Sequence, residues 1–79
     1  MMEVTLYTPE SSRTFEAGAL FLPGSYAPFE VLPGHAPIIS TLGEGKVRWV
    51  SDGREESLDI RSGAVRVVSD KVEICAELL

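Results

Sequence analysis

Cysteine, histidine and long apolar runs are the scarce features of this 79-residue sequence, which contains only Cys75 and His35 of the first two types. A single cysteine cannot form an internal disulfide, and one cysteine with one distant histidine does not make a zinc site. We therefore expect a reduced, intracellular chain without metal or other cofactor. No segment approaches the roughly 18 apolar residues of a membrane span, and Met1-Met2-Glu3 does not resemble a signal peptide.

Groups that carry out catalysis are equally scarce. A serine hydrolase would need His35 as its base, and neither Ser40 nor Ser62 lies in a Gly-x-Ser-x-Gly context. Cys75 lies in a strand-like segment, where a thiol is usually inert. Gly43-Glu44-Gly45 is followed by a strand pattern rather than by a third glycine and a helix, so it does not predict a phosphate-binding loop. We expect a protein that is not an enzyme.

The charge balance is acidic, with 12 Asp and Glu against 7 Lys and Arg, a net charge of -5 and a pI of about 4.7. Such a chain repels phosphate backbones and anionic headgroups, so we expect neither nucleic acid binding nor direct insertion into lipid. Between Ala17 and Gly43 the only formal charge is Glu30, and four of the 5 prolines lie there. This stretch either supplies much of the core or is partly covered by another protein.

Alternation of apolar and polar residues dominates the second half of the chain. Four segments show it in turn: Lys46–Trp49, Ser57–Arg61, Ala64–Val67 and Lys71–Ile74. Turn-forming residues separate them: Ser51–Gly53, Ser62–Gly63 and Ser69–Asp70. A period of two, with turns about every eight to ten residues, predicts an antiparallel meander with one face in water.

The first half of the chain adds shorter strands, so that we expect about eight to ten in all. The predicted segments are Glu3–Thr8, Arg13–Phe15, Ala19–Leu22, Phe29–Leu32 and Ile38–Leu42. One-sided strands bury their apolar faces when two sheets pack together, which predicts one all-β sandwich domain over residues 1–79. The predicted core is Val4, Leu6, Leu20, Leu22, Val31, Leu42, Val47, Trp49, Leu58, Ile60, Val65, Val67, Val72 and Ile74.

The segment Leu32-Pro33-Gly34-His35-Ala36-Pro37 interrupts the strand pattern. Two prolines and a glycine predict a rigid loop with His35 at its tip. The imidazole ring can donate and accept hydrogen bonds. Two roles remain open at this point: the ring ties the loop to nearby backbone, which the chemistry alone favours, or it contacts a partner.

The same loop carries a family resemblance. Leu22-Pro23-Gly24-Ser25 and then Val31-Leu32-Pro33-Gly34-His35-Ala36-Pro37-Ile38-Ile39 resemble the epsilon subunit of F-type ATP synthases (delta in mitochondria), whose pattern reads roughly LPG…GELGILPGHAPLL. Further matches follow the family's order along almost the whole chain: Thr8-Pro9-Glu10 with Phe15, Gly45-Lys46-Val47-Arg48, Arg61-Ser62-Gly63-Ala64-Val65 and Lys71-Val72-Glu73-Ile74. A free-standing β-sandwich module for a sugar or peptide is the alternative, but it has no reason to share these ordered matches.

The resemblance implies a flattened β-sandwich of about ten short, mainly antiparallel strands in the central stalk (rotor) of a proton-translocating ATP synthase. Such a subunit binds the gamma subunit and the c-ring, couples ion flow to ATP synthesis, and lies peripherally at the cytoplasmic face of the inner (plasma) membrane. The gamma interface would comprise Thr8, Pro33, Gly34 and His35. The c-ring interface would comprise Tyr26, Ala27, Pro28, Phe29 and Glu30. Because the sequence ends at Leu79, we expect the family's C-terminal helical hairpin, and the inhibition it exerts, to be absent.

Overall fold

The computed structural model describes residues 1–79 and contains strands and turns but no helix. Consequently no helix is long and apolar enough to cross a membrane. The eight strands are β1 (Met2–Thr8), β2 (Ser11–Ala17), β3 (Ala19–Leu22), β4 (Phe29–Val31), β5 (Ile38–Leu42), β6 (Gly45–Ser51), β7 (Arg54–Val68) and β8 (Lys71–Leu78). Most connections are tight turns, and the two longer ones flank β4.

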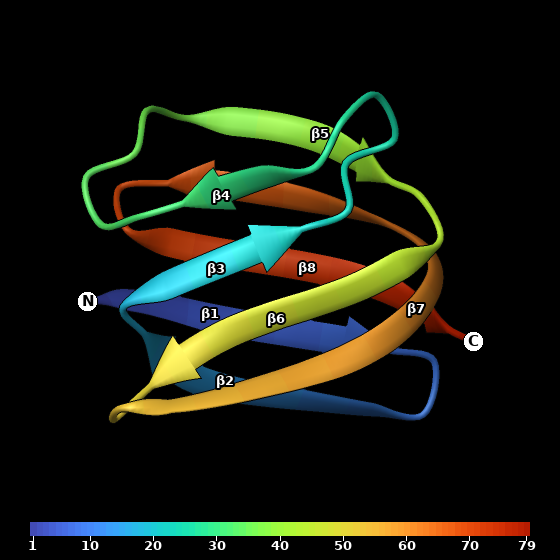
Figure 1. Ribbon diagram of the computed structural model, residues 1–79, viewed down its shortest axis with the longest axis horizontal. Coiled ribbons are helices and arrows are strands. Elements are labelled where there is room, and N and C mark those ends of the chain that lie inside the picture. The colour runs from blue at the N-terminus through green and yellow to red at the C-terminus, as the bar shows by residue number, and fades with distance from the viewer.

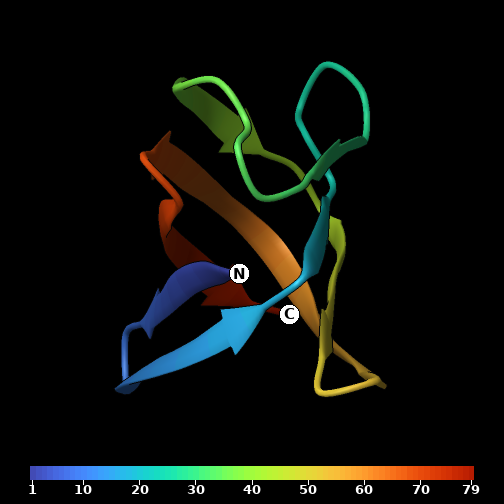
Figure 2. The same cartoon turned by 90° about the vertical axis from the view of Figure 1, so that its left-hand side faces the viewer.

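The strands form one sheet that folds over on itself into two layers (Figures 1 and 2). One layer consists of β2, β1, β8, the C-terminal half of β7, and β5, and the other of β4, β3, β6 and the N-terminal half of β7. All pairs are antiparallel except β1 with β8. This confirms the predicted all-β sandwich.

The long strand β7 joins the two layers and corrects the expected number of strands. The predicted turn at Ser62–Gly63 is wrong, because β7 runs through it from Arg54 to Val68; the eight strands are the lower end of the eight to ten expected from the residues and fewer than the ten that the resemblance implies. The register of β7 against β8 shifts between Ile60 and Ser62, which is a β-bulge. A bulge bends a strand without ending it. Here the bend carries one strand from one layer into the other.

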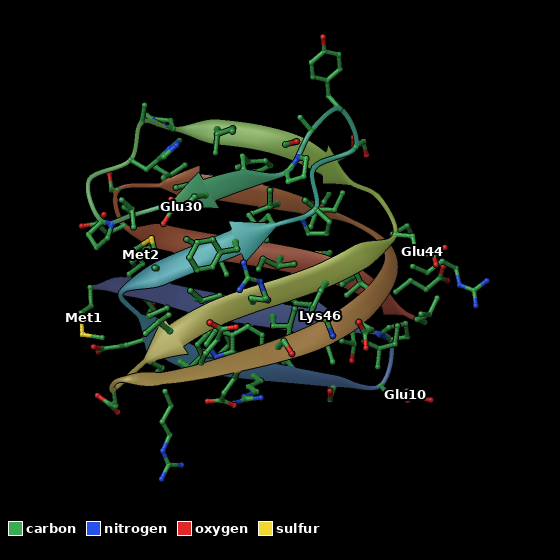
Figure 3. The ribbon with its side chains drawn as sticks, in the orientation of Figure 1. Met1, Met2, Glu10, Glu30, Glu44 and Lys46 are labelled. Atoms are coloured by element: carbon green, nitrogen blue, oxygen red, sulfur yellow. The ribbon has the colours of Figure 1, made fainter.

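The core between the layers is entirely apolar. Sixteen residues are buried: Met2, Val4, Leu6, Ala17, Leu20, Leu22, Val31, Leu42, Val47, Trp49, Ile60, Val65, Val67, Val72, Ile74 and Ala76. Of the predicted core only Leu58 is not fully buried, and it packs against the cluster from its rim. Met2, Ala17 and Ala76 were not predicted, and the first two are paired at the ends of β1 and β2. The Met2 side chain points into the core, whereas Met1 projects from the edge of the molecule (Figure 3).

Trp49 closes one side of this core. Its side chain is 2% exposed and stacks on Phe15, with ring centroids 4.6 Å apart. The Arg13 guanidinium lies over both rings and pairs with the Glu56 carboxylate at 3.1 Å. These four side chains join β2 of one layer to β6 and β7 of the other. The stacked rings and the ion pair above them therefore cover the open side of the folded sheet.

Candidate functional site

The His35 loop, residues 32–37, connects β4 to β5 beside the β7–β8 turn, at one end of the long axis (Figure 1). Its Gly34 has a φ of +84°, a backbone conformation that glycine adopts without steric cost. The His35 amide donates to the Leu32 carbonyl at 3.1 Å and closes a tight turn. Pro33 and Gly34 are exposed. The loop is therefore an ordered projection, as the sequence predicted.

The His35 ring makes one hydrogen bond, and it lies within the loop. Nδ1 is 2.7 Å from the Ala36 carbonyl oxygen. Because a carbonyl only accepts, Nδ1 is the donor, and Nε2 of the neutral ring remains an acceptor. The ring is only half-buried. Nδ1 thus ties the ring to the loop backbone, which is the role that the chemistry favoured. Nε2 is free to accept a hydrogen bond from a partner.

Asp70 attaches the loop to the rest of the sandwich. The Gly34 amide donates to Asp70 Oδ1 at 2.7 Å, and the Asp70 carbonyl accepts from the Glu3 amide at 2.9 Å. Asp70 lies in the β7–β8 turn with a φ of +62°. In the sequence, Ser69–Asp70 indicates a turn and nothing more, because a contact between residues 36 positions apart leaves no local pattern.

Thr8 lies at the opposite end of β1 from this loop. Glu3 is beside Asp70, and Thr8 is five residues further along β1, about 16 Å at roughly 3.3 Å per residue. The Thr8 hydroxyl lies 3.1 Å from that of Ser11, across the β1–β2 turn. The structure therefore brings Pro33, Gly34 and His35 together but not Thr8. A surface that includes all four must run along the outer face of the layer that contains β1.

That outer face carries exposed apolar side chains. Ile39 is 81% exposed, Tyr7 43% and Val68 40%. Tyr7, Cys75, Ala64 and Thr41 form one row across β1, β8, β7 and β5, each opposite the next in register. Three members of the row, Tyr7, Cys75 and Ala64, line a shallow hollow that Thr8 and Pro9 border. The only ion pair on this face joins Arg66 to Glu73 at 3.6 Å. Exposed charged side chains lie among these apolar ones, with Lys71, Glu73 and Glu77 on β8 and Arg66 on β7, so the face is mixed rather than one apolar patch.

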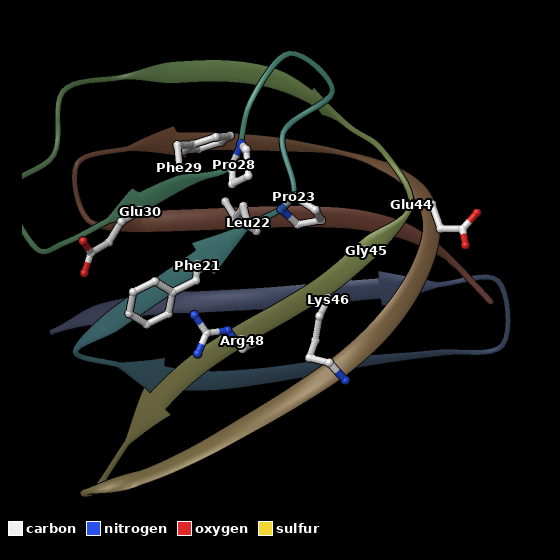
Figure 4. A pocket seen from close by; sticks show the side chains of 10 residues that line it. All are labelled: Phe21, Leu22, Pro23, Pro28, Phe29, Glu30, Glu44, Gly45, Lys46 and Arg48. Carbon is white, nitrogen blue, oxygen red and sulfur yellow. The ribbon is translucent and has the colours of Figure 1, made fainter.

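The outer face of the other layer is charged and paired within the chain. Lys46 pairs with Asp59 and Arg48 with Glu55, each at 3.1 Å. The Arg48 guanidinium also lies 4.6 Å from the centroid of the Phe21 ring. Figure 4 shows the open hollow beside these residues. Because its cations already have partners, we assign it no ligand, and nowhere do three His, Cys, Asp or Glu side chains converge as metal ligands would.

The Tyr26 loop, residues 23–28, connects β3 to β4 and projects at the top of the view in Figure 1, right of its centre, whereas the His35 loop lies at the left. Tyr26 is fully exposed (103%), and Ala27 and Pro28 are exposed beside it. Phe29 and Glu30 belong to β4 instead of the loop: Phe29 packs against the core, and Glu30 lies exposed on the outer face (Figure 3). Of the five predicted c-ring residues, the structure thus gathers only three at one tip.

Gly24, at the base of the Tyr26 loop, leaves no room for a side chain. A Cβ there would overlap the Ala27 carbonyl oxygen and lie 2.9 Å from the Phe29 ring. We expect Gly24→Ala to displace the loop and to lower the free energy of unfolding by about 1–3 kcal/mol, measured by urea titration. Gly43→Ala is the matched control, because its nearest atom would be 3.9 Å away. Equal midpoints for the two variants would contradict the expectation.

Comparisons with known proteins connect this geometry to a family. Residues 1–78 match the family described as "ATP synthase, Delta/Epsilon chain, beta-sandwich domain". The ATP synthase epsilon chain of Desulfitobacterium hafniense (strain DSM 10664 / DCB-2) is 37% identical over 62 residues, which cover 78% of this chain and 47% of that one. The epsilon chain of Wolinella succinogenes is 30% identical over 79 residues, which cover 98% and 60%. The chain thus spans about half to three-fifths of the length of these relatives.

Solved structures share the fold. A chain of the Tetrahymena thermophila mitochondrial ATP synthase central stalk and c-ring superposes with a TM-score of 0.82 at 19% identity, over 96% of this chain and 63% of that chain. A chain of the Euglena gracilis mitochondrial ATP synthase (OSCP/F1/c-ring, rotational state 1) gives 0.89 at 19% identity, over 95% and 49%. The resemblance found in the sequence is confirmed, and the chain belongs to the β-sandwich family of ATP synthase delta/epsilon chains.

Proposed function

We propose that this chain is a central-stalk (rotor) component of a proton-translocating F-type ATP synthase, where it binds the gamma subunit and the c-ring and couples ion flow to ATP synthesis. The match of residues 1–78 to the delta/epsilon β-sandwich family carries the proposal. In this role the chain has no catalytic activity of its own. It lies peripherally at the cytoplasmic face of the inner (plasma) membrane, held there by the complex.

The His35 loop and the adjoining outer face form the proposed gamma surface. The loop offers Nε2 of His35 as a hydrogen-bond acceptor, and the face offers Ile39, Val68 and Tyr7 as apolar contact area. Thr8 then lies at the far end of the same surface rather than beside His35. Partner-covered surfaces combine such apolar area with a few oriented polar groups.

The Tyr26 loop forms the proposed c-ring surface. It projects from a different part of the molecule than the His35 loop (Figure 1), so the two partners do not compete for one site. Tyr26 supplies a large ring and a hydroxyl group on a loop that Pro23 and Pro28 stiffen. Tyrosine is among the residues that most often dominate binding energy at protein interfaces.

Reconstitution tests the proposed function. An ATP synthase core lacking its delta/epsilon chain is combined with this chain, and binding to gamma, ATP-driven proton pumping and ATP hydrolysis are measured. We expect stoichiometric binding to gamma and restored pumping. Absence of gamma binding by the folded chain would contradict the proposal and return the free-standing binding module as the better account.

Tyr26→Ala should weaken attachment of the gamma-bound chain to membranes that contain the c-ring by about tenfold, because it removes an exposed aromatic anchor. Affinity for isolated gamma should not change, since the Tyr26 loop projects away from the His35 loop (Figure 1). Tyr26→Phe, which retains the ring, is the control and should lose less. Sedimentation with c-ring membranes measures the effect, and wild-type attachment of Tyr26→Ala would exclude the tyrosine from this contact.

A further inference from the structure

The His35 loop is joined to the rest of the sandwich by a single hydrogen bond. The His35 amide bond to Leu32 and the ring bond to Ala36 both lie within the loop. Outside the loop, the Gly34 amide alone finds an acceptor, the Asp70 carboxylate at 2.7 Å. The orientation of the loop therefore depends on a side chain that is distant in sequence and contributes nothing to the loop's own turn.

The backbone conformation at Asp70 restricts which residue types fit there. Ser69 and Asp70 both have positive φ values, +49° and +62°. Asparagine, aspartate and glycine tolerate this conformation best among the residue types. Of these three, only aspartate and asparagine also provide a side-chain acceptor. The backbone of Asp70 is held at the same time by the Glu3 amide, so the carboxylate is fixed relative to β1 and the β7–β8 turn.

We propose that Asp70 is a positioning residue for partner binding: its carboxylate holds the His35 loop in the orientation that meets gamma. This inference rests on the proposed function, and it adds a residue that touches no partner. The bond is charge-assisted and short, as such bonds are. A loop fixed before binding loses less conformational freedom when the complex forms, and this raises affinity.

Three substitutions separate the Gly34–Asp70 hydrogen bond from the conformation of the turn. Asp70→Gly removes the carboxylate and also relaxes the positive φ, so the turn and the fold should persist. Asp70→Asn keeps both the tolerance of positive φ and a side-chain acceptor. Ser69→Gly relaxes the same turn while leaving the Gly34–Asp70 bond intact. In Asp70→Gly we expect hydrogen exchange of the Gly34 amide to accelerate about tenfold and gamma affinity to fall by about three- to tenfold.

The two readouts are amide exchange, followed by NMR in the free protein, and a gamma titration by calorimetry. Ser69→Gly should stay within about twofold of wild type in both, and Asp70→Asn, whose amide oxygen is a weaker acceptor than a carboxylate, should fall between wild type and Asp70→Gly. Wild-type gamma affinity in Asp70→Gly overturns the proposal, and so does an equal loss in Ser69→Gly. If the wild-type chain itself does not bind gamma, the proposed function fails, and the Gly34 amide in the free protein still reports whether Asp70 holds the loop.

Discussion

Trp49→Ala is expected to lower the free energy of unfolding by about 3–5 kcal/mol. Trp49 is the largest fully buried side chain, and it stacks on Phe15 beneath Arg13. Truncation leaves a cavity where β2 meets the other layer, and the two smaller neighbours cannot fill it. A domain of this length has roughly 4–12 kcal/mol in total. Urea unfolding followed by far-UV circular dichroism should show a variant at or near the limit of folding.

Trp49→Phe is the control for this substitution. The Trp49 Nε1 atom is buried without a hydrogen-bond partner. Phenylalanine removes this unsatisfied donor, whose burial is unfavourable, and retains an aromatic ring to stack on Phe15. The free energy of unfolding should therefore fall by only about 1–2 kcal/mol, and this loss reflects the smaller volume of the phenylalanine ring. If both variants lose the same amount, the stacking of the ring contributes little, and the account of how Trp49 closes the core is wrong.

The fold could be predicted where structure follows from local periodicity. Alternation placed Val65 and Val67 inward on β7 and Val72 and Ile74 inward on β8, and all four are buried. It failed at Ser62–Gly63, because small polar residues favour a bulge as readily as a turn, and only the pairing of β7 with β8 distinguishes them. The path of one strand through both layers is a property of the whole sheet.

In the candidate site, too, the locally determined features could be predicted and the long-range ones could not. Two prolines and Gly34 predicted an ordered loop with His35 at its tip, because turn chemistry is local. The separation of Thr8 from that loop was not predictable, because it depends on the parallel pairing of β1 with β8, which joins the two ends of the chain. The contact between Asp70 and Gly34 has the same origin, since it arises only once β7 and β8 bring their turn beside the loop.

His35→Ala is expected to weaken binding of the gamma subunit by about 1–3 kcal/mol, roughly 5- to 150-fold in the dissociation constant. The ring carries two separable functions: Nδ1 donates to the Ala36 carbonyl within the loop, and Nε2 makes no hydrogen bond within the chain. Alanine removes both. Calorimetric titration with gamma measures the loss, and a thermal melt of each variant confirms that it is folded.

Asparagine and glutamine at position 35 separate the two functions. Asparagine places a polar group near Nδ1 and can keep the bond to Ala36, whereas glutamine reaches the position of Nε2 and keeps an acceptor for the partner. If Nε2 meets gamma, His35→Gln should retain more affinity than His35→Asn, although it loses the bond within the loop. The opposite order would assign the effect of His35 to loop structure alone. Wild-type affinity in all three folded variants would exclude the ring from the gamma interface and leave the outer face of the sheet, with Ile39 and Val68, as the surface that gamma contacts.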